Sequence, residues 1–238
     1  MASLLGIDCA TQPGKVGLAL GEVDGERVCI TRCRLASRRE SPVEIAAAWL
    51  ADSAEAIVAL DAPLGWPKAL GAALASHEAG SPMAASADEL FRRATDLHVM
   101  CRLGKRPLEV GANLIWLTAV AALELLESLR RRTGRPIPLA WAPEEREPFR
   151  AIEVYPAATR LAHGARDVGG SLEGLEAIVD VHSIDRSVLD SLHAADAVVC
   201  VLAAADFLRG RACRPHDLEL ARAEGWVWVA DGEGCTSH

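Results

Sequence analysis

Two short apolar runs, each closed by an aspartate, constrain the fold of this chain more than any other feature. One run extends from Ser3 to Asp8 and the other from Ala56 to Asp61. Apolar runs of this length, bounded by turn residues, are typical of strands buried on both faces of a sheet. Open α/β sheets bind ligands just beyond the carboxyl ends of such strands. The pair predicts two carboxylates in one cleft, although either aspartate alone is also typical of a turn.

The segments around these runs predict a mixed sheet. Strands are expected at residues 16–20 and 27–33, joined by a hairpin turn at Asp24-Gly25, which gives an antiparallel meander with the first strand. Residues 41–51 open with the capping-box pattern Ser-Pro-Val-Glu and predict a helix. The strand that ends at Asp61 then follows a right-handed crossover and lies parallel to the first strand.

The remainder of the chain predicts a helical insertion, a fifth strand and a closing helix. Helices are expected at 69–77, 87–98, 113–132, 157–163, 172–180 and 187–209. The last helix is expected to begin with a capping box at Ser187 and Asp190. A basic loop is expected at 102–107, and strands are expected at 151–156 and 225–229. We expect residues 1–238 to form one α/β domain with a helical insertion at 68–149. Its five-stranded mixed sheet, three antiparallel strands followed by two parallel ones, is flanked by helices and has the order of the ribonuclease H-like fold.

The bulk properties exclude several classes of protein. The formal net charge is −8 and the pI about 5.4, which argues against wholesale coating of nucleic acid but allows a local basic groove. No apolar run is long enough to span a membrane, so no membrane association is expected. Asp8 interrupts the early apolar run, which argues against a secretory signal.

The cysteines argue against a zinc site. Seven are scattered along the chain without a CxxC pair: Cys9, Cys29, Cys33, Cys101, Cys200, Cys213 and Cys235. Several lie inside apolar runs and are interpreted as small core residues. A reduced, cytoplasmic compartment is the expected location.

Asp196 is a third candidate acid because it interrupts an apolar helix face. It shares a stripe with Leu192, Val199 and Ala203. A carboxylate on such a face is costly unless it is paired with an arginine, protonated or bound to a metal ion. His193, one turn earlier, is a ligand, a base or a satisfied core histidine.

Further candidates lie in the fifth strand and in the insertion. Glu153 either faces solvent or points into the same cleft as the aspartates. The insertion carries a polar and mostly basic set, which either contacts an anionic substrate or forms a solvated helix face: Arg92, Arg93, Asp96, Lys105 and Arg106.

Several acids in one site repel each other and require cations. Carboxylate oxygens are hard ligands, so two Mg²⁺ or Mn²⁺ ions are the expected cofactors, held by Asp8, Asp61 and Asp196. Two such ions can activate a water and stabilise the leaving oxygen in phosphodiester hydrolysis. The predicted partner is therefore a nucleic acid or another phosphodiester.

Five motifs in order resemble a known family. They are Gly6-Ile-Asp-Cys-Ala10, Asp61-Ala-Pro-Leu-Gly-Trp-Pro67, Arg93-Ala-Thr-Asp96 with Gly104-Lys-Arg-Pro107, Glu153-Val-Tyr-Pro156 and His193-Ala-Ala-Asp-Ala197. The stretch 3–208 is thereby similar to domain-of-unknown-function family 429, whose members are regarded as ribonuclease H-like nucleases.

The resemblance implies catalytic roles for four acids. Asp8, Asp61 and Asp196 match the acidic positions of ribonuclease H-like sites, and Glu153 matches the family's fifth-strand glutamate. His193 looks like a histidine that some Holliday-junction resolvases carry on the equivalent helix.

Three functions remain open from the sequence. The first is a metal-dependent nuclease or related phosphoesterase. The second is a non-catalytic binding or regulatory protein that retains the ribonuclease H-like fold. The third, a phosphotransferase of the actin and sugar-kinase type, ranks last because the chain has one such half and no glycine-rich phosphate loops.

Overall fold

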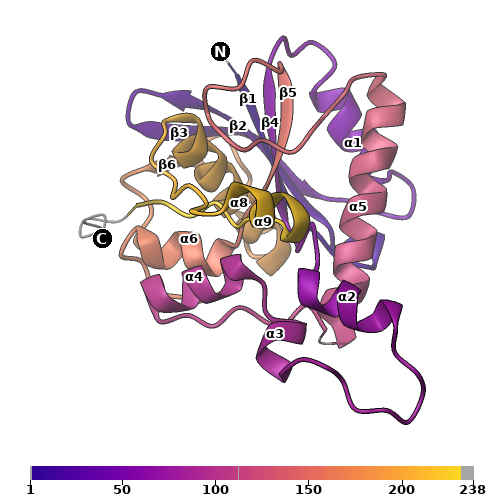
Figure 1. The fold of residues 1–238 in the computed structure, drawn as a ribbon. Helices are drawn as coiled ribbons and strands as arrows, with labels where there is room; N and C mark the ends of the chain where they lie inside the picture. The colour runs from indigo at the N-terminus through magenta and orange to yellow at the C-terminus, as the bar shows by residue number, and fades with distance from the viewer. Residues whose placement is uncertain (1, 112, 232–238) are drawn as a thin grey trace.

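A mixed six-stranded sheet forms the centre of the molecule (Figure 1). The computed structural model describes residues 2–111 and 113–231. The strands are β1 (Ser3–Asp8), β2 (Gly17–Asp24), β3 (Arg27–Leu35), β4 (Ala56–Asp61), β5 (Phe149–Glu153) and β6 (Val179–Asp180), in the spatial order β5-β4-β1-β2-β3-β6. β1, β2 and β3 are antiparallel neighbours, whereas β4 and β5 continue the sheet parallel to β1. The α/β class is therefore confirmed.

The number of strands differs from the five expected. The sixth strand, β6, pairs in parallel with the start of β3 through Val28 and Val179. It has two residues, too few for any hydrophobic periodicity, and it lies in a segment that had been expected to be helical. The segment 225–229, expected as a strand, contributes only an isolated bridge between Glu153 and Val227.

Helices cover both faces of the sheet (Figure 1). They are α1 (Pro42–Trp49), α2 (Lys68–Ala75), α3 (Ala87–Phe91), α4 (Ala94–Leu103), α5 (Asn113–Thr133), α6 (Pro156–Ala162), α7 (Arg186–Leu189), α8 (Leu192–Leu208) and α9 (Leu218–Glu224), with a 3-10 turn at Pro13–Lys15. α1 and α5 pack on one face, where Leu5, Val58 and Leu126 share a core. α8 packs on the other face, where Leu4, Ile57 and Val198 share a second core.

Two predicted helices are each divided in the structure. The 87–98 segment separates into α3 and α4 because the backbone at Arg92 is extended and the Asp96 side chain caps a new helix at Arg93. The 187–209 segment separates into α7 and α8. The capping residue is Asp185, whose Oδ1 accepts a hydrogen bond from the Ser187 nitrogen at 3.0 Å, so the expected box at Ser187 is wrong.

The described cysteines are free thiols, and Cys235 lies outside the described residues. Over the described ranges, none of the helices combines the length and the apolar character needed to cross a bilayer.

Candidate functional site

Asp8 and Asp61 end two neighbouring strands and face the same side of the sheet. They are partners in the parallel ladder between β1 and β4. Ladder partners project their side chains to the same face. That face is covered by α8, because Leu4, Ile57 and Ala59, at even spacings before the two aspartates, belong to the core beneath it. The two carboxyl groups therefore lie side by side at the carboxyl end of the sheet.

Two glycines allow α8 to cross directly over this point. Gly17 is the ladder partner of Asp8, and a Cβ added there would lie 1.9 Å from the His193 carbonyl oxygen. A Cβ added at Gly6 would lie 2.1 Å from the Ala197 carbonyl oxygen. The close approach brings His193 Nδ1 to 2.5 Å from Asp8 Oδ2. The strand glycines thus place the first turn of α8 on the aspartate pair.

Asp196, one turn further along α8, is paired with a buried arginine. Its Oδ1 accepts hydrogen bonds from the Arg160 guanidinium and, at 3.3 Å, from the Gly170 nitrogen. The Arg160 side chain is 2% exposed, comes from α6, and also donates from Nε to the Ser171 carbonyl oxygen at 2.9 Å. The arginine partner is thus one of the alternatives that the sequence left open. Its identity was missed because nothing in the sequence distinguishes Arg160 among 25 Lys and Arg residues.

Burial and mutual repulsion perturb the acids. Burial, and then the charge of Asp196, raises the pKa of Asp8 to about 8. Burial and the charges of Asp8 and Asp196 also raise the pKa of Asp61 well above its ordinary value, while Arg160 opposes both shifts. Burial lowers the pKa of His193. Near pH 7 the contact between His193 and Asp8 therefore joins two largely neutral groups that share a proton.

Glu153 ends β5 but lies on the opposite face of the sheet. Its ladder partner is Leu60, not Asp61. Leu60 and Ala151 both belong to the core on the α1 and α5 side. A difference of one residue in register turns a side chain to the other face. Glu153 therefore projects from the other face of the sheet. It is buried, so the solvent-facing alternative is wrong, and it borders a pocket that Asp61 also lines.

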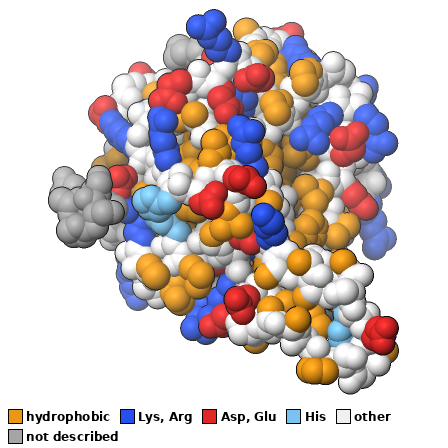
Figure 2. Space-filling view, viewed as in Figure 1, with side chains coloured by type: hydrophobic (Ala, Val, Ile, Leu, Met, Phe, Trp, Pro, Cys, Tyr) orange, Lys and Arg blue, Asp and Glu red, His pale blue; other side chains and the backbone are white. Residues whose placement is uncertain are grey.

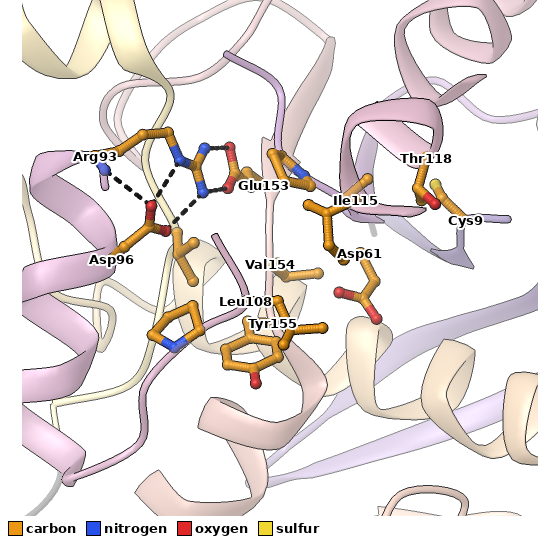
Figure 3. Close-up of a pocket in the computed structure, with 14 residues that line it drawn as sticks. Cys9, Asp61, Arg93, Asp96, Leu108, Ile115, Thr118, Glu153, Val154 and Tyr155 are labelled. Atoms are coloured by element: carbon orange, nitrogen blue, oxygen red, sulfur yellow. Dashed lines mark hydrogen bonds and ion pairs between the residues drawn. The ribbon is translucent and has the colours of Figure 1, made fainter. Parts of the chain in front are cut away.

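Glu153 instead forms a buried network with Arg93 and Asp96 (Figure 3). Arg93 donates to both oxygens of Glu153, at 2.7 and 3.0 Å, and to both oxygens of Asp96, at 2.9 and 3.2 Å. All three side chains are at most 5% exposed. Glu153 Oε2 also accepts a hydrogen bond from the Leu64 nitrogen at 2.9 Å, which holds the chain that follows Asp61. Arg93 and Asp96, expected as substrate contacts, thus tie α4 to β5.

Three other candidate residues of the insertion are paired with nearby carboxylates or exposed. Arg92 pairs with two carboxylates of the insertion itself, and Lys105 pairs with Asp167. Arg106 is exposed. On the face seen in Figure 2, cationic and acidic side chains are interspersed and form no continuous basic stripe. Contact between Arg92 or Lys105 and an anionic substrate stays a prediction.

A pocket of about 260 Å³ opens beside Asp61 (Figure 3). Its mostly apolar walls comprise Cys9, Asp61, Ala62, Pro63, Arg93, Asp96, Pro107, Leu108, Ile115, Thr118, Glu153, Val154, Tyr155 and Val227. Sequence reasoning did not single out Tyr155, Leu108 or Ile115. Tyr155 stands two residues after Glu153 in a quoted motif, which was the available signal. Leu108 and Ile115 carry no such signal in the sequence, because only the fold of the insertion brings them to the strand ends.

The donor chemistry of the aspartates suits a hard divalent cation. Asp8, Asp61 and Asp196 offer carboxylate oxygens, and a cation relieves the repulsion that raises the pKa values of Asp8 and Asp61. Among residues 2–111 and 113–231, no group of three or more His, Cys, Asp and Glu side chains is arranged as a metal cluster. His193 and Arg160 already contact two of the three acids. A bound ion has to share or replace those contacts.

The fold and this site define an α/β protein with an acidic cluster at the carboxyl end of its parallel strands. The chain belongs to the family described as "Protein of unknown function (DUF429)", whose model matches residues 6–220. The resemblance drawn from the five motifs is thereby confirmed.

Comparison with other proteins adds little beyond the family. No curated protein matches the chain. Among solved structures, the chain is similar to RuvC of T. thermophilus in complex with a Holliday junction substrate, at 16% identity. The match covers 56% of this chain and 97% of that one, with a TM-score of 0.17. So low a score carries no argument about the fold.

Proposed function

We propose that this protein is a divalent-metal-dependent phosphodiesterase of the nuclease class on a ribonuclease H-like fold. The observation that carries the proposal is the pair of Asp8 and Asp61 on adjacent parallel strands, with Asp196 brought to the same region by α8. The sheet order supports the fold, because an antiparallel meander of three strands continues into two parallel ones as that fold requires.

The three aspartates would hold Mg²⁺ or Mn²⁺, two ions being the expected number. Bound ions lower the pKa of a water and neutralise charge on the leaving oxygen. Asp8, Asp61 and Asp196 would supply the carboxylate oxygens that hold them.

Two neighbouring side chains support the aspartates. His193 orients the Asp8 carboxyl through Nδ1. Its lowered pKa keeps the ring neutral near pH 7, so it can accept a proton there. Arg160 holds Asp196 in place and supplies a permanent positive charge. Glu153, for which the resemblance implies a catalytic role, is committed to Arg93 and has no role in this proposal.

The test is a substrate panel with matched variants. Single-stranded, double-stranded, hybrid and branched nucleic acids are assayed with Mg²⁺ and with Mn²⁺. Asp8→Asn and Asp61→Asn are nearly isosteric and are expected to abolish turnover, whereas Asp52→Asn, at an exposed turn, leaves it unchanged. Turnover that survives both site variants and excess chelator contradicts the proposal.

A non-catalytic binding protein is the second candidate. The observation in its favour is that His193 and Arg160 already satisfy Asp8 and Asp196 without an ion. This candidate predicts no heat of Mn²⁺ binding in calorimetry and no turnover on the panel. Metal binding that is lost in Asp61→Asn decides against it.

A further inference from the structure

The pocket beside Asp61 combines walls from distant parts of the chain. The chain after β4 contributes Pro63, the loop between α4 and α5 contributes Leu108, and α5 contributes Ile115. Tyr155 follows β5, and Val227 lies on the segment bridged to it. The insertion therefore encloses a space that opens directly onto a carboxylate of the proposed catalytic site.

The charges that border this pocket do not suit a phosphate. Arg93, which would be the natural anion ligand, is saturated by Glu153 and Asp96. The remaining titratable group in the wall is the Asp61 carboxyl, which cannot attract an anion. Among the described wall residues, an anion inside the pocket would thus find no unpaired cation. The phosphate is expected to remain at the aspartates, and an uncharged group to enter the pocket.

Two polar groups are left to orient such an uncharged group. Within the described part of the chain, neither the Asp61 carboxyl nor the Tyr155 hydroxyl has a hydrogen-bonding partner, and Figure 3 shows both among apolar side chains. A mostly apolar pocket with a few convergent polar groups is the usual form of a small-ligand site. The Tyr155 ring adds a flat aromatic surface on which another ring can stack.

The size of the pocket limits its occupant to one ring system. An apolar cavity of roughly 150 Å³ is large enough to bind benzene, and this pocket measures about 260 Å³. Pockets for drug-sized ligands begin at about 300 Å³. A single heteroaromatic ring system, larger than benzene and with polar edge atoms, matches both limits, and a base pair does not.

We propose that this pocket binds one uncharged heteroaromatic ring of a nucleotide-type phosphodiester whose phosphate lies at the aspartates. The phosphodiester part rests on the proposed function, whereas binding of the ring does not. The substrate is consequently a small nucleotide or an unpaired nucleotide of a single strand, and a paired duplex is excluded from the pocket.

The first experiment measures binding without catalysis. Adenosine and thymidine are titrated against the full chain in the presence of chelator and followed by ligand-observed NMR, with ribose as the ringless control. Both nucleosides are expected to bind, and ribose is not. Ile115→Trp fills the pocket and should weaken nucleoside binding at least tenfold. Leu117→Trp, at an exposed site of the same helix, should leave it unchanged.

A second variant guards against misfolding of the first. Tyr155→Phe keeps the ring and removes only the hydroxyl, so it is expected to weaken nucleoside binding severalfold with no change in Tm. Equal nucleoside affinity in Ile115→Trp and Leu117→Trp overturns the proposal. So does the absence of nucleoside binding to the wild-type protein.

The second experiment distinguishes the sources of the ring. A dinucleotide, a single-stranded oligonucleotide and a blunt duplex compete against bound adenosine. Competition by the dinucleotide alone indicates a small nucleotide, and competition by both unpaired ligands indicates a single strand. Equal competition by the duplex contradicts the one-ring pocket. Nucleoside binding without hydrolysis of any phosphodiester rejects the proposed function alone, and hydrolysis without nucleoside binding rejects this inference alone.

Discussion

At the scale of single residues, the site is a set of acids whose charges are only partly compensated. Asp8 contacts a histidine, Asp196 contacts an arginine, and Asp61 faces a pocket. Arg160 is a permanent cation beside the acids and opposes the rise in the pKa values of both Asp8 and Asp61. Each of these groups can be tested by a substitution that changes charge with little change in size.

Asp8→Asn should stabilise the protein increasingly as the pH rises. The pKa of Asp8 is about 8 in the folded protein, against an ordinary value of 3.8, so folding takes up a proton between these pH values. The wild type therefore loses stability as the pH rises through that window, and asparagine does not. With chelator present, the free energy of unfolding measured in urea should be higher for the variant than for the wild type by about 2 kcal/mol or more at pH 9. The two values should be nearly equal at pH 4. The same difference at both pH values contradicts the shift.

Arg160→Met should destabilise the protein by about 3 kcal/mol, because Asp196 is left poorly solvated without its cation. The double variant Arg160→Met/Asp196→Leu should recover most of that loss in urea unfolding. Arg211→Met is the control, since its ion pair with Glu26 is exposed and should contribute little to the free energy of unfolding. A double variant no more stable than Arg160→Met would show that the pair is not the source of the loss.

At the scale of elements, the Arg93 network joins three parts of the chain. Arg93 precedes α4, Glu153 ends β5, and Glu224 ends α9. Glu224 accepts hydrogen bonds from the Ala94 and Lys68 nitrogens, both at 2.8 Å. The insertion is thus fastened to the sheet and to the C-terminal region beside the pocket.

Gly225→Ala should disrupt this junction. The residue has φ of +86°, and an added Cβ would lie 2.6 Å from Glu153 Oε2 and 3.1 Å from Arg93 Nη1. We expect the free energy of unfolding, measured by thermal or urea denaturation, to fall by about 2 kcal/mol or more. Gly71→Ala, in α2 with open space around it, should instead stabilise by up to about 1 kcal/mol. Equal effects of the two substitutions would contradict the close contact.

At the scale of the whole molecule, an acidic chain without a continuous basic stripe on the face seen in Figure 2 is expected to make few phosphate contacts. Affinity for a single strand falls with salt in proportion to the number of such contacts. Binding of a single-stranded oligonucleotide should therefore weaken less than about tenfold between 50 and 200 mM salt. Fluorescence anisotropy at several salt concentrations measures this slope. A drop of a thousandfold would reveal a basic surface elsewhere.

Sequence patterns predicted the strands that carry the central aspartates because a buried strand is a local feature. Asp8 and Asp61 end such runs, and the meander is set by short turns. The face of Glu153 was not predictable, because a register shift of one residue reverses it and no local signal fixes the β4–β5 register. Arg160 and Leu108 reach the site through tertiary contacts, which leave no periodicity in the sequence.

The two-residue strand β6 bears on whether a second chain can add to the edge of the sheet. An unpaired sheet edge is a template on which a second chain can add. β6 occupies the start of one edge strand, β3, and the remainder of β3 carries Arg32 and Arg34, whose charges disfavour such addition. At the opposite edge, isolated bridges from Leu139 and Val227 cover β5. Addition of a chain along β5 or along the start of β3 therefore requires a covering segment to detach first, so resistance to such addition depends on local unfolding of these segments rather than on global stability.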